Sequence, residues 1–199
     1  MARPVSIRND AILDAARKVF LRYGYQAATA RVAREAGVSE GSLFKHFKTK
    51  SDLFLAAMEV ESKVQAWQKQ LMQSVGAGDI RQTLEVAGRK LLRQIQTLMP
   101  RIVMVRSSGI VITGGDRLHG QPPPEIKMLT AYFKAESRQG RLVIRAPEAL
   151  AHIFVGALSH YAFCETIFGY RPAPPGAYVR IIVDILLQAI RPGKQKDSV

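Results

Sequence analysis

Apolar residues recur at helical spacing along most of the chain. Over residues 12–23 they follow one another at i, i+4, i+7, i+8 and i+11, which is the pattern of a helix with one buried face. Gly24 is expected to end this helix, because glycine commonly follows the last helical turn. Comparable spacing predicts further helices over residues 51–73, 80–98, 125–139, 147–168 and 177–190. The pattern therefore predicts an all-α fold.

Proline and glycine divide these segments. Asp79 is expected to cap the helix over residues 80–98, and Pro100 to interrupt it, because proline lacks the backbone N–H that a helix interior needs. A further helix is expected over residues 101–111, although the β-branched run 110–113 is also compatible with an extended chain, a choice that periodicity does not decide. Loops are predicted at residues 113–124, 141–146 and 169–176, and a polar tail at residues 192–199.

The last two predicted helices are apolar on more than one side. The helix over residues 147–168 carries large apolar side chains on opposite faces. The helix over residues 177–190 keeps polar side chains only in one narrow stripe, at Arg180, Asp184, Gln188 and Arg191. A helix this apolar must be buried on more than one face. We therefore expect both helices to pack against a second copy of the chain as a four-helix bundle, which makes the protein a homodimer.

Two short helical segments near the N-terminus, residues 30–36 and 40–47, are separated by only three residues. Two short helices joined by a tight turn that contains glycine are typical of a helix-turn-helix. In this interpretation Gly37 supplies the turn conformation, Ser39 caps the second helix, and Ala33 is small where the helices cross. The outward positions of the second helix are then small or polar: Glu40, Gly41, Ser42, Lys45 and His46. Such a helix is able to enter the major groove of DNA and reach base edges.

The charge of the chain agrees with a polyanionic partner. Its 29 Lys and Arg residues outnumber its 16 Asp and Glu residues, which gives a net charge of +13. Positive charge is densest near the N-terminus, where residues 1–50 carry ten of the basic and four of the acidic residues. A nucleic acid and an anionic membrane surface both fit this excess. Because the basic residues do not gather on one amphipathic face, as membrane-surface binding requires, we expect DNA and no membrane partner.

Motifs for catalysis, metal binding and redox chemistry are missing from the sequence. There is no Walker A run and no Gly-x-Ser-x-Gly motif, and His119, His152 and His160 do not have the spacing of a metal site. Cys164 is the only cysteine, so one chain forms neither a disulfide nor a thiolate metal site. We therefore predict no enzyme activity, no cofactor and no metal. Neither a signal peptide nor an apolar run of about 18 residues is visible, which predicts a cytoplasmic protein.

The N-terminal third of the chain matches a known signature at fixed spacing. The matching residues are Ile12-Leu13-Asp14-Ala15-Ala16, Phe20, Gly24-Tyr25, Val32-Ala33, Ala36-Gly37-Val38-Ser39, Gly41-Ser42-Leu43-Phe44-Lys45-His46-Phe47, Lys50 and Leu53-Phe54. In these positions the sequence resembles the TetR family of bacterial repressors. The resemblance implies a three-helix helix-turn-helix domain over residues 1–50 and a helical effector-binding and dimerisation domain over residues 51–199. It also implies a repressor that binds a double-stranded DNA operator as a homodimer and is released by a small, largely apolar effector.

The resemblance further implies which residues contact DNA: Thr29, Glu40, Gly41, Ser42, Phe44, Lys45, His46 and Lys50. Lys50 matches the phosphate-contacting lysine of the family. Two positions depart from the family pattern, which often has tyrosine where Phe44 stands and threonine or serine where Ala28 stands. The first departure puts a phosphate hydrogen bond in doubt, and the second is expected to shift the helix cap to Thr29, whose hydroxyl could also touch a phosphate.

Other residues of this region have two open interpretations. Glu40 either accepts a hydrogen bond from a cytosine amino group or simply favours the N-terminus of its helix. Arg3 and Arg8 form a basic arm that either reaches the minor groove or stays in solvent.

The effector is expected to bind between the helices that cover residues 51–168. Candidate contact residues are Trp67, Met104, Met128, Tyr132, His160 and Phe163, each of which also fits plain core packing. The long helix expected over residues 51–73 is the natural lever, because it touches both domains. An enzyme and an unregulated structural DNA-binding protein are the alternative functions.

Overall fold

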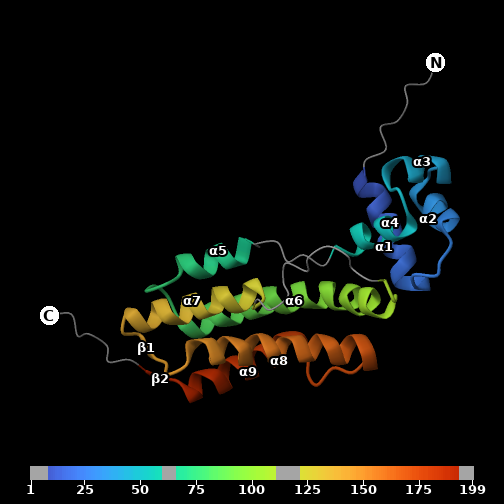
Figure 1. Ribbon diagram of the computed structural model, residues 1–199. Helices are drawn as coiled ribbons and strands as arrows, with labels where there is room; N and C mark the ends of the chain where they lie inside the picture. The colour runs from blue at the N-terminus through green and yellow to red at the C-terminus, as the bar shows by residue number, and fades with distance from the viewer. Residues whose placement is uncertain (1–8, 60–65, 111–121, 193–199) are drawn as a thin grey trace. The chain divides into compact units, whose positions relative to one another are not determined.

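The computed structural model describes residues 9–59, 66–110 and 122–192, and these residues are helical over most of their length (Figure 1). The all-α fold class predicted from the sequence is confirmed. Some sequence predictions fall outside the described residues. They are the basic arm with Arg3 and Arg8, most of the β-branched run at 110–113, most of the loop at 113–124 with His119, and nearly all of the polar tail.

The chain divides into two compact units. The unit that we call the N-terminal unit comprises residues 1–61 and 100–114, and the bundle unit comprises residues 62–99 and 115–199. The division into domains of residues 1–50 and 51–199 stays a prediction.

The N-terminal unit is built on α1 (Asn9–Tyr23), α2 (Thr29–Ala36), α3 (Glu40–His46) and α4 (Lys50–Met58), together with the last turns of α6. α1 packs against both α2 and α4. It is followed by Gly24 at a φ of +77°, which confirms the predicted helix end. The rings of Phe20 and Phe54 meet edge to face with their centroids 5.2 Å apart, and both are fully buried. This contact anchors α4 on α1.

The prediction of a single helix over residues 51–73 is wrong. α4 ends at Met58, Glu59 leaves the helical region with a φ of +20°, and the next described helix is α5 (Ala66–Gln73). The apolar stripe is continuous in the sequence, but its halves belong to different cores: Met58 is buried in the N-terminal unit and Trp67 in the bundle unit. Periodicity shows that apolar residues share a face and does not show which core buries them. The lever expected from one long helix therefore loses its structural basis.

α6 (Ile80–Ser107) begins directly after Asp79, which caps it as predicted: the Asp79 carboxylate accepts a hydrogen bond of 2.9 Å from the backbone N–H of Gln82. The predicted interruption at Pro100 is wrong, because the helix continues through this residue. A proline inside a helix costs about 3 kcal/mol. Burial on both sides offsets this cost, since Ile95 packs on the core of the bundle unit and Val105 is buried in the core of the N-terminal unit.

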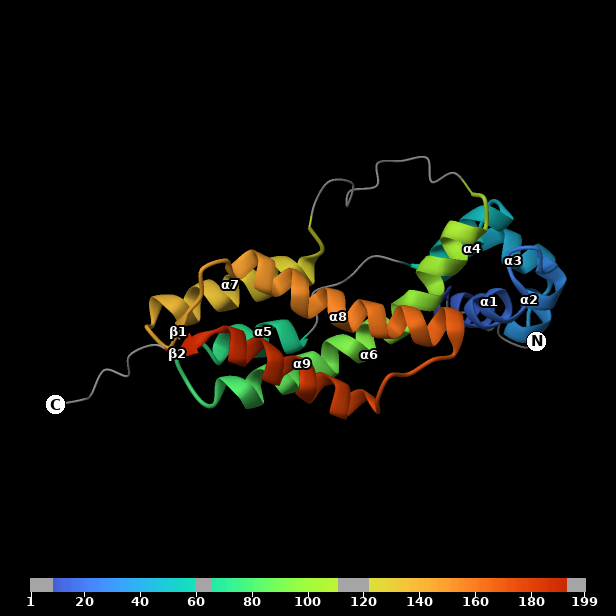
Figure 2. The same ribbon diagram turned by 90° about the horizontal axis from the view of Figure 1, so that it is seen from below.

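The bundle unit consists of α5, α6 up to Met99, α7 (Pro124–Arg138), α8 (Pro147–Phe168) and α9 (Pro175–Ala189). The bounds of α7, α8 and α9 are close to the predicted ones. α7 packs against α5 and α8, and α8 lies beside α9 (Figure 2). At Gly88 of α6 a methyl group would lie 2.8 Å from Cγ1 of Val179 and 2.9 Å from Cζ of Phe154. Only glycine fits there without a shift of its neighbours, so Gly88 lets α6 come close to both α8 and α9.

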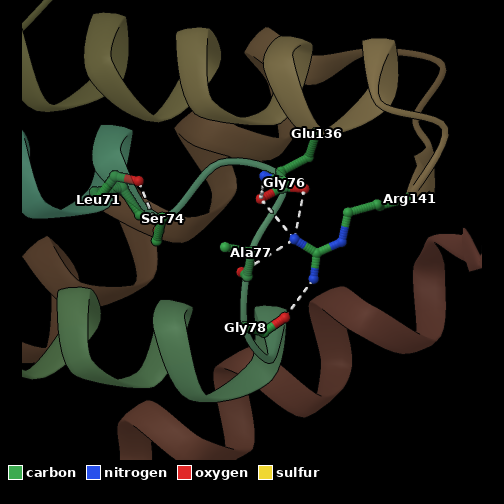
Figure 3. A network of polar contacts seen from close by, with 7 residues as sticks. All are labelled: Leu71, Ser74, Gly76, Ala77, Gly78, Glu136 and Arg141. Carbon is green, nitrogen blue, oxygen red and sulfur yellow. Dashed lines mark hydrogen bonds and ion pairs between the residues drawn. The ribbon is translucent and has the colours of Figure 1, made fainter.

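Arg141 fastens the turn between α5 and α6 to the end of α7 (Figure 3). Its guanidinium lies 3.2 Å from the fully buried carboxylate of Glu136. It also donates hydrogen bonds to the backbone carbonyls of Ala77, at 3.1 Å, and Gly78. The backbone N–H of Gly76 donates to the same carboxylate at 3.4 Å. One buried charge thus holds together segments that are about 60 residues apart.

Immediately after Arg141, β1 (Leu142–Val143) pairs antiparallel with β2 (Arg191–Pro192). The sequence predicts a link and a tail at these positions rather than strands. A strand of two residues is too short to produce an alternating pattern, so periodicity carries no signal for it.

Candidate nucleic-acid interface

The turn between α2 and α3 has the conformation that the sequence predicts. Gly37 has a φ of +69°, in the left-handed region that favours glycine, and the N–H of Val38 donates to the carbonyl of Ala33 at 2.9 Å. Ser39 caps α3, because its hydroxyl accepts a hydrogen bond of 3.1 Å from the N–H of Ser42. Both predictions are confirmed, and together these contacts fix α3 relative to α2.

α3 presents a polar outer face. Its one buried residue is Leu43, which is fully covered and anchors the helix on the core of the N-terminal unit. The remaining residues are accessible: Glu40, Gly41, Phe44, Lys45 and His46 are exposed, and Ser42 is half-buried. Lys45 and His46 carry N–H donors that suit base acceptors, and the 41% exposed ring of Phe44 suits the methyl group of thymine. The face therefore has the chemistry needed to read a major groove.

Thr29 and Glu40 contact each other across the turn. The Thr29 hydroxyl donates to Oε1 of Glu40 at 2.6 Å, which joins the first turn of α2 to the first turn of α3. The predicted role of Thr29 as a helix cap is wrong, because Ala28 occupies the cap position and makes no side-chain capping bond. Since the contact depends on the geometry of the turn, no sequence signal points to it. The carboxylate of Glu40 thus has a partner inside the protein as well as a place at the N-terminus of α3.

Lys50 begins α4 and lies over the ring of Tyr25, with Nζ 4.8 Å from the ring centroid. The hydroxyl groups of Tyr25 and Ser51 are 2.9 Å apart and share a hydrogen bond. Thr49 and Asp52 close a capping box at the same helix end, in which each side chain accepts a hydrogen bond from the other's backbone N–H. Lys50, to which the family resemblance assigns a phosphate contact, is therefore the first residue of a helix whose N-terminus is held by a capping box.

Tyr23 and Tyr25 each carry a basic side chain on the ring face, a role that the sequence analysis does not predict for them. The guanidinium of Arg31 lies over the ring of Tyr23, 4.1 Å from its centroid. The only signal for such contacts in the sequence is the concentration of aromatic and basic residues between Arg22 and Arg31.

Three of the predicted effector contacts lie in the core of the bundle unit. Trp67 and Tyr132 are buried, and Met128 packs against the same core. The indole N–H of Trp67 donates to Gln94 at 3.0 Å, and the side-chain amide of Gln94 donates to Glu125 at 2.9 Å. Burial raises the pKa of the Tyr132 hydroxyl, and the neighbouring carboxylate of Glu136 raises it further. Polar side chains are thus bonded to one another inside this unit.

A cleft of about 260 Å³ lies beside α5 and α6 in the bundle unit. Its lining includes the apolar residues Trp67, Leu71, Val86 and Ala87 and the polar residues Gln70, Ser74, Gln82, Thr83 and Lys90. Nζ of Lys90 donates to Oε1 of Gln70 at 2.6 Å, which links the two helices. Of the predicted effector contacts, Trp67 alone lines this cleft.

The structure places the other three predicted effector contacts elsewhere. Met104 packs against the core of the N-terminal unit and not in the bundle unit. His160 and Phe163 lie on the exposed face of α8, where their rings stack with centroids 6.5 Å apart. The type of a side chain does not show which face of its helix packs against a neighbouring helix, so the sequence alone does not place these three residues.

The fold and the outer face of α3 define a helix-turn-helix protein with a helical bundle. Residues 12–57 match the family model of bacterial regulatory proteins of the tetR family, and residues 82–190 match the AefR-like transcriptional repressor, C-terminal domain. The second match alone covers more than half of the chain. The protein therefore belongs to the TetR family of transcriptional regulators, as predicted.

Individual proteins resemble the chain in sequence or in fold. The repressor AcnR of Corynebacterium diphtheriae is 45% identical over 53 residues, which are 26% of this chain and 28% of AcnR, so the chain spans less than a third of that relative. The HTH-type transcriptional regulator YvkB of Bacillus subtilis is 27% identical over 164 residues, 81% of this chain and 80% of its own. A crystal structure of a TetR transcriptional regulator from Agrobacterium tumefaciens is 21% identical, covers 96% of each chain and has a TM-score of 0.68.

The helices of the described ranges include none that is long and apolar enough to cross a membrane. Among the same residues, no three or more potential ligands gather in a way that would hold a metal ion.

Proposed function

We propose that the protein is a transcriptional repressor that binds an operator in double-stranded DNA as a homodimer and is released by a small, largely apolar effector. The observation that supports this most directly is the exposed polar face of α3, held by Gly37 and Ser39 in a helix-turn-helix. The proposal places the protein in the cytoplasm, together with the DNA that it regulates.

In the proposed complex α3 lies in the major groove, with Glu40, Gly41, Ser42, Phe44, Lys45 and His46 facing the bases. Lys50 and Thr29 contact phosphates at the edges of the groove. Three features support this division: α3 is exposed, Lys50 lies at a helix N-terminus that favours anions, and Thr29 lies in the first turn of α2.

Fluorescence anisotropy tests the DNA-binding proposal. We would compare the DNA upstream of the protein's own gene with a scrambled duplex of equal length, across a series of salt concentrations. We expect the native duplex to bind at least about a thousandfold more tightly and with a steep dependence on salt. Lys45→Ala is expected to weaken that binding by about 5- to 150-fold, since a good base contact contributes about 1–3 kcal/mol.

Lys134→Ala is the matched control, because it removes the same charge from an exposed position of α7. It is expected to leave the affinity for the native duplex close to that of the unmodified protein. Equal binding of both duplexes, or equal losses in the two variants, would contradict sequence-specific recognition by α3.

Gly41→Ala separates the needs of the fold from those of the interface. Gly41 does not lie in the left-handed region, and an added methyl group would meet only the Ser39 hydroxyl, at 3.9 Å, an ordinary contact. Because alanine favours a helix by about 1 kcal/mol over glycine, we expect the thermal midpoint to stay or rise. In a helix pressed against base edges the methyl group crowds the DNA, so we expect about tenfold weaker operator binding. A variant that is as stable and binds as tightly as the unmodified protein would place Gly41 away from the DNA.

The homodimer is supported by apolar side chains that stay exposed on α8 and α9, which lie side by side (Figure 2). On α8 these are Ile153, Phe163 and Ile167, and on α9 they are Ile181 and Ile185. Gly156 shares the α8 stripe, and a methyl group there would meet nothing within 4 Å in its own chain. Soluble monomers rarely leave large apolar patches uncovered, and a second copy would bury this one in a four-helix bundle.

The effector is proposed to bind in the bundle unit at the cleft that Trp67 lines. The lining of this cleft combines apolar side chains with polar ones that could orient a bound molecule, as small-molecule sites do. The same anisotropy assay tests release, with a small-molecule extract of the producing cells added to the complex with the native duplex. We expect the extract to lower the anisotropy of the complex with the unmodified protein, but not with Val86→Phe, whose larger side chain at an exposed position would occupy part of the cleft. Loss of anisotropy to the same extent in both proteins would move the effector site elsewhere.

A further inference from the structure

The ring of Tyr23 gathers two arginines at the end of α1. The guanidinium carbon of Arg31, in α2, lies 4.1 Å from the ring centroid, and that of Arg22 lies 5.2 Å from it. Tyr23 is 46% exposed and both arginines are exposed, so the group lies on the protein surface. An aromatic face attracts a guanidinium group and leaves its N–H donors, which lie in the guanidinium plane, available to a ligand.

In the described chain neither Arg22 nor Arg31 is paired with a carboxylate. Nearby acids have other partners: Asp14 accepts from Arg17 at 2.6 Å, and Glu35 lies 3.7 Å from Lys18. Two guanidinium groups against one ring therefore concentrate positive charge that the described residues do not neutralise. An anion with several acceptor oxygens is the ligand that suits such a group.

A second tyrosine holds a cation in the same way. Tyr25 carries Lys50 on its face, and its own ring is fixed by an edge contact with Phe54, with centroids 4.9 Å apart. Lys50 is the residue proposed above to contact a phosphate. The two tyrosines flank Gly24, and each carries a cation from a helix that follows in the chain, Arg31 from α2 and Lys50 from α4.

We propose that Tyr23 is a positioning residue, which holds Arg31 as a further contact to the sugar–phosphate backbone of the bound DNA duplex. This inference rests on the DNA-binding function proposed above. Two observations favour DNA over an acidic protein surface: the group belongs to the compact unit that carries α3, and Arg31 projects from α2, the helix that crosses the backbone in a helix-turn-helix complex. Guanidinium groups match phosphate oxygens in geometry as well as charge.

The dependence of binding on salt tests this proposal, because each neutralised phosphate adds about 0.9 to the slope of log affinity against log salt concentration. Anisotropy would be measured on the native and scrambled duplexes with Arg31→Gln, Tyr23→Leu, Tyr23→Phe and the double variant Tyr23→Leu/Arg31→Gln. Arg138→Gln removes the same charge from the exposed end of α7 and serves as the control. Thermal midpoints of all variants are expected to agree, since the side chains are exposed.

We expect Arg31→Gln to reduce the slope by about 0.9 for each bound subunit, equally on both duplexes, while Arg138→Gln leaves it unchanged. Tyr23→Leu should weaken binding by about two- to fivefold at low salt, and Tyr23→Phe, which keeps the aromatic face, should bind like the unmodified protein. The double variant should bind like Arg31→Gln alone, because Tyr23 acts through Arg31.

Two outcomes would overturn the proposal while leaving the DNA-binding function intact. One is an unchanged slope in Arg31→Gln, which would show that Arg31 neutralises no phosphate. The other is a loss in the double variant equal to the product of the two single losses, which would show that Tyr23 does not act through Arg31. Failure of the unmodified protein to bind either duplex at low salt would overturn the DNA-binding function and this proposal together.

Discussion

Exchange of both Ile181 and Ile185 for aspartate is expected to leave the chain folded but monomeric, and to weaken operator binding by at least about 100-fold. The two side chains are 49% and 55% exposed on α9, so the fold of one chain does not depend on them. If a second copy covers their exposed half, each isoleucine contributes about 1 kcal/mol of burial, and both subunits lose two such residues. The carboxylates add the cost of burying unpaired charge. A monomer has only one α3 to hold the operator, so affinity falls with dimerisation.

Light scattering coupled to size exclusion measures the mass, and the anisotropy assay measures the affinity. Val143→Asp is the control, because it places one carboxylate at an exposed apolar position of the bundle unit outside α8 and α9. We expect this control to remain a dimer. A dimeric double variant with an unchanged helical spectrum would show that the subunits associate through another surface.

Arg141→Met is expected to lower the free energy of unfolding by about 3–5 kcal/mol, the usual effect of removing one partner from a buried ion pair. The carboxylate of Glu136 is completely buried, and without Arg141 it would keep only the N–H of Gly76, at 3.4 Å, among its contacts in Figure 3. The carbonyls of Ala77 and Gly78 would lose donors as well. Urea denaturation measures the change.

A double variant identifies the cause of this loss. Glu136→Leu combined with Arg141→Met removes both charges, so we expect it to recover a large part of the stability that Arg141→Met loses. Arg138→Met is the control, because Arg138 is exposed at the end of α7, the helix that contains Glu136. It should change the free energy of unfolding by no more than about 0.5 kcal/mol. Equal losses in Arg138→Met and Arg141→Met would contradict the role of the buried pair.

Local chemistry explains why the helix-turn-helix is predictable from the sequence. The turn needs a left-handed residue and a helix cap within three positions, and Gly37 and Ser39 satisfy these needs with their own backbone and side chain. The buried anchor Leu43 follows from spacing in the same way. None of these features depends on residues far along the chain. The roles of α3 in binding DNA stay a prediction, because no local rule identifies the partner of an exposed residue.

Features that depend on distant parts of the chain are not predictable in this way. The stripe over residues 51–73 is helical at both ends, yet Met58 and Trp67 enter different cores. Pro100 fails to end α6 because packing on both sides outweighs its local cost. His160 illustrates the same limit for site residues, since only the assembled bundle shows that it lies on an exposed face of α8.

Trp67 allows the unfolding of the bundle unit to be followed separately from that of the N-terminal unit. It is the only tryptophan of the chain, and it lies in the core of the bundle unit, 6% exposed, with its indole N–H bonded to Gln94. Tryptophan emission is therefore an optical label for one unit alone, whereas far-ultraviolet circular dichroism registers the helices of both. The two signals coincide during unfolding only if both units melt in one cooperative step. A dichroism change at constant emission would indicate that the N-terminal unit unfolds while the bundle unit stays intact.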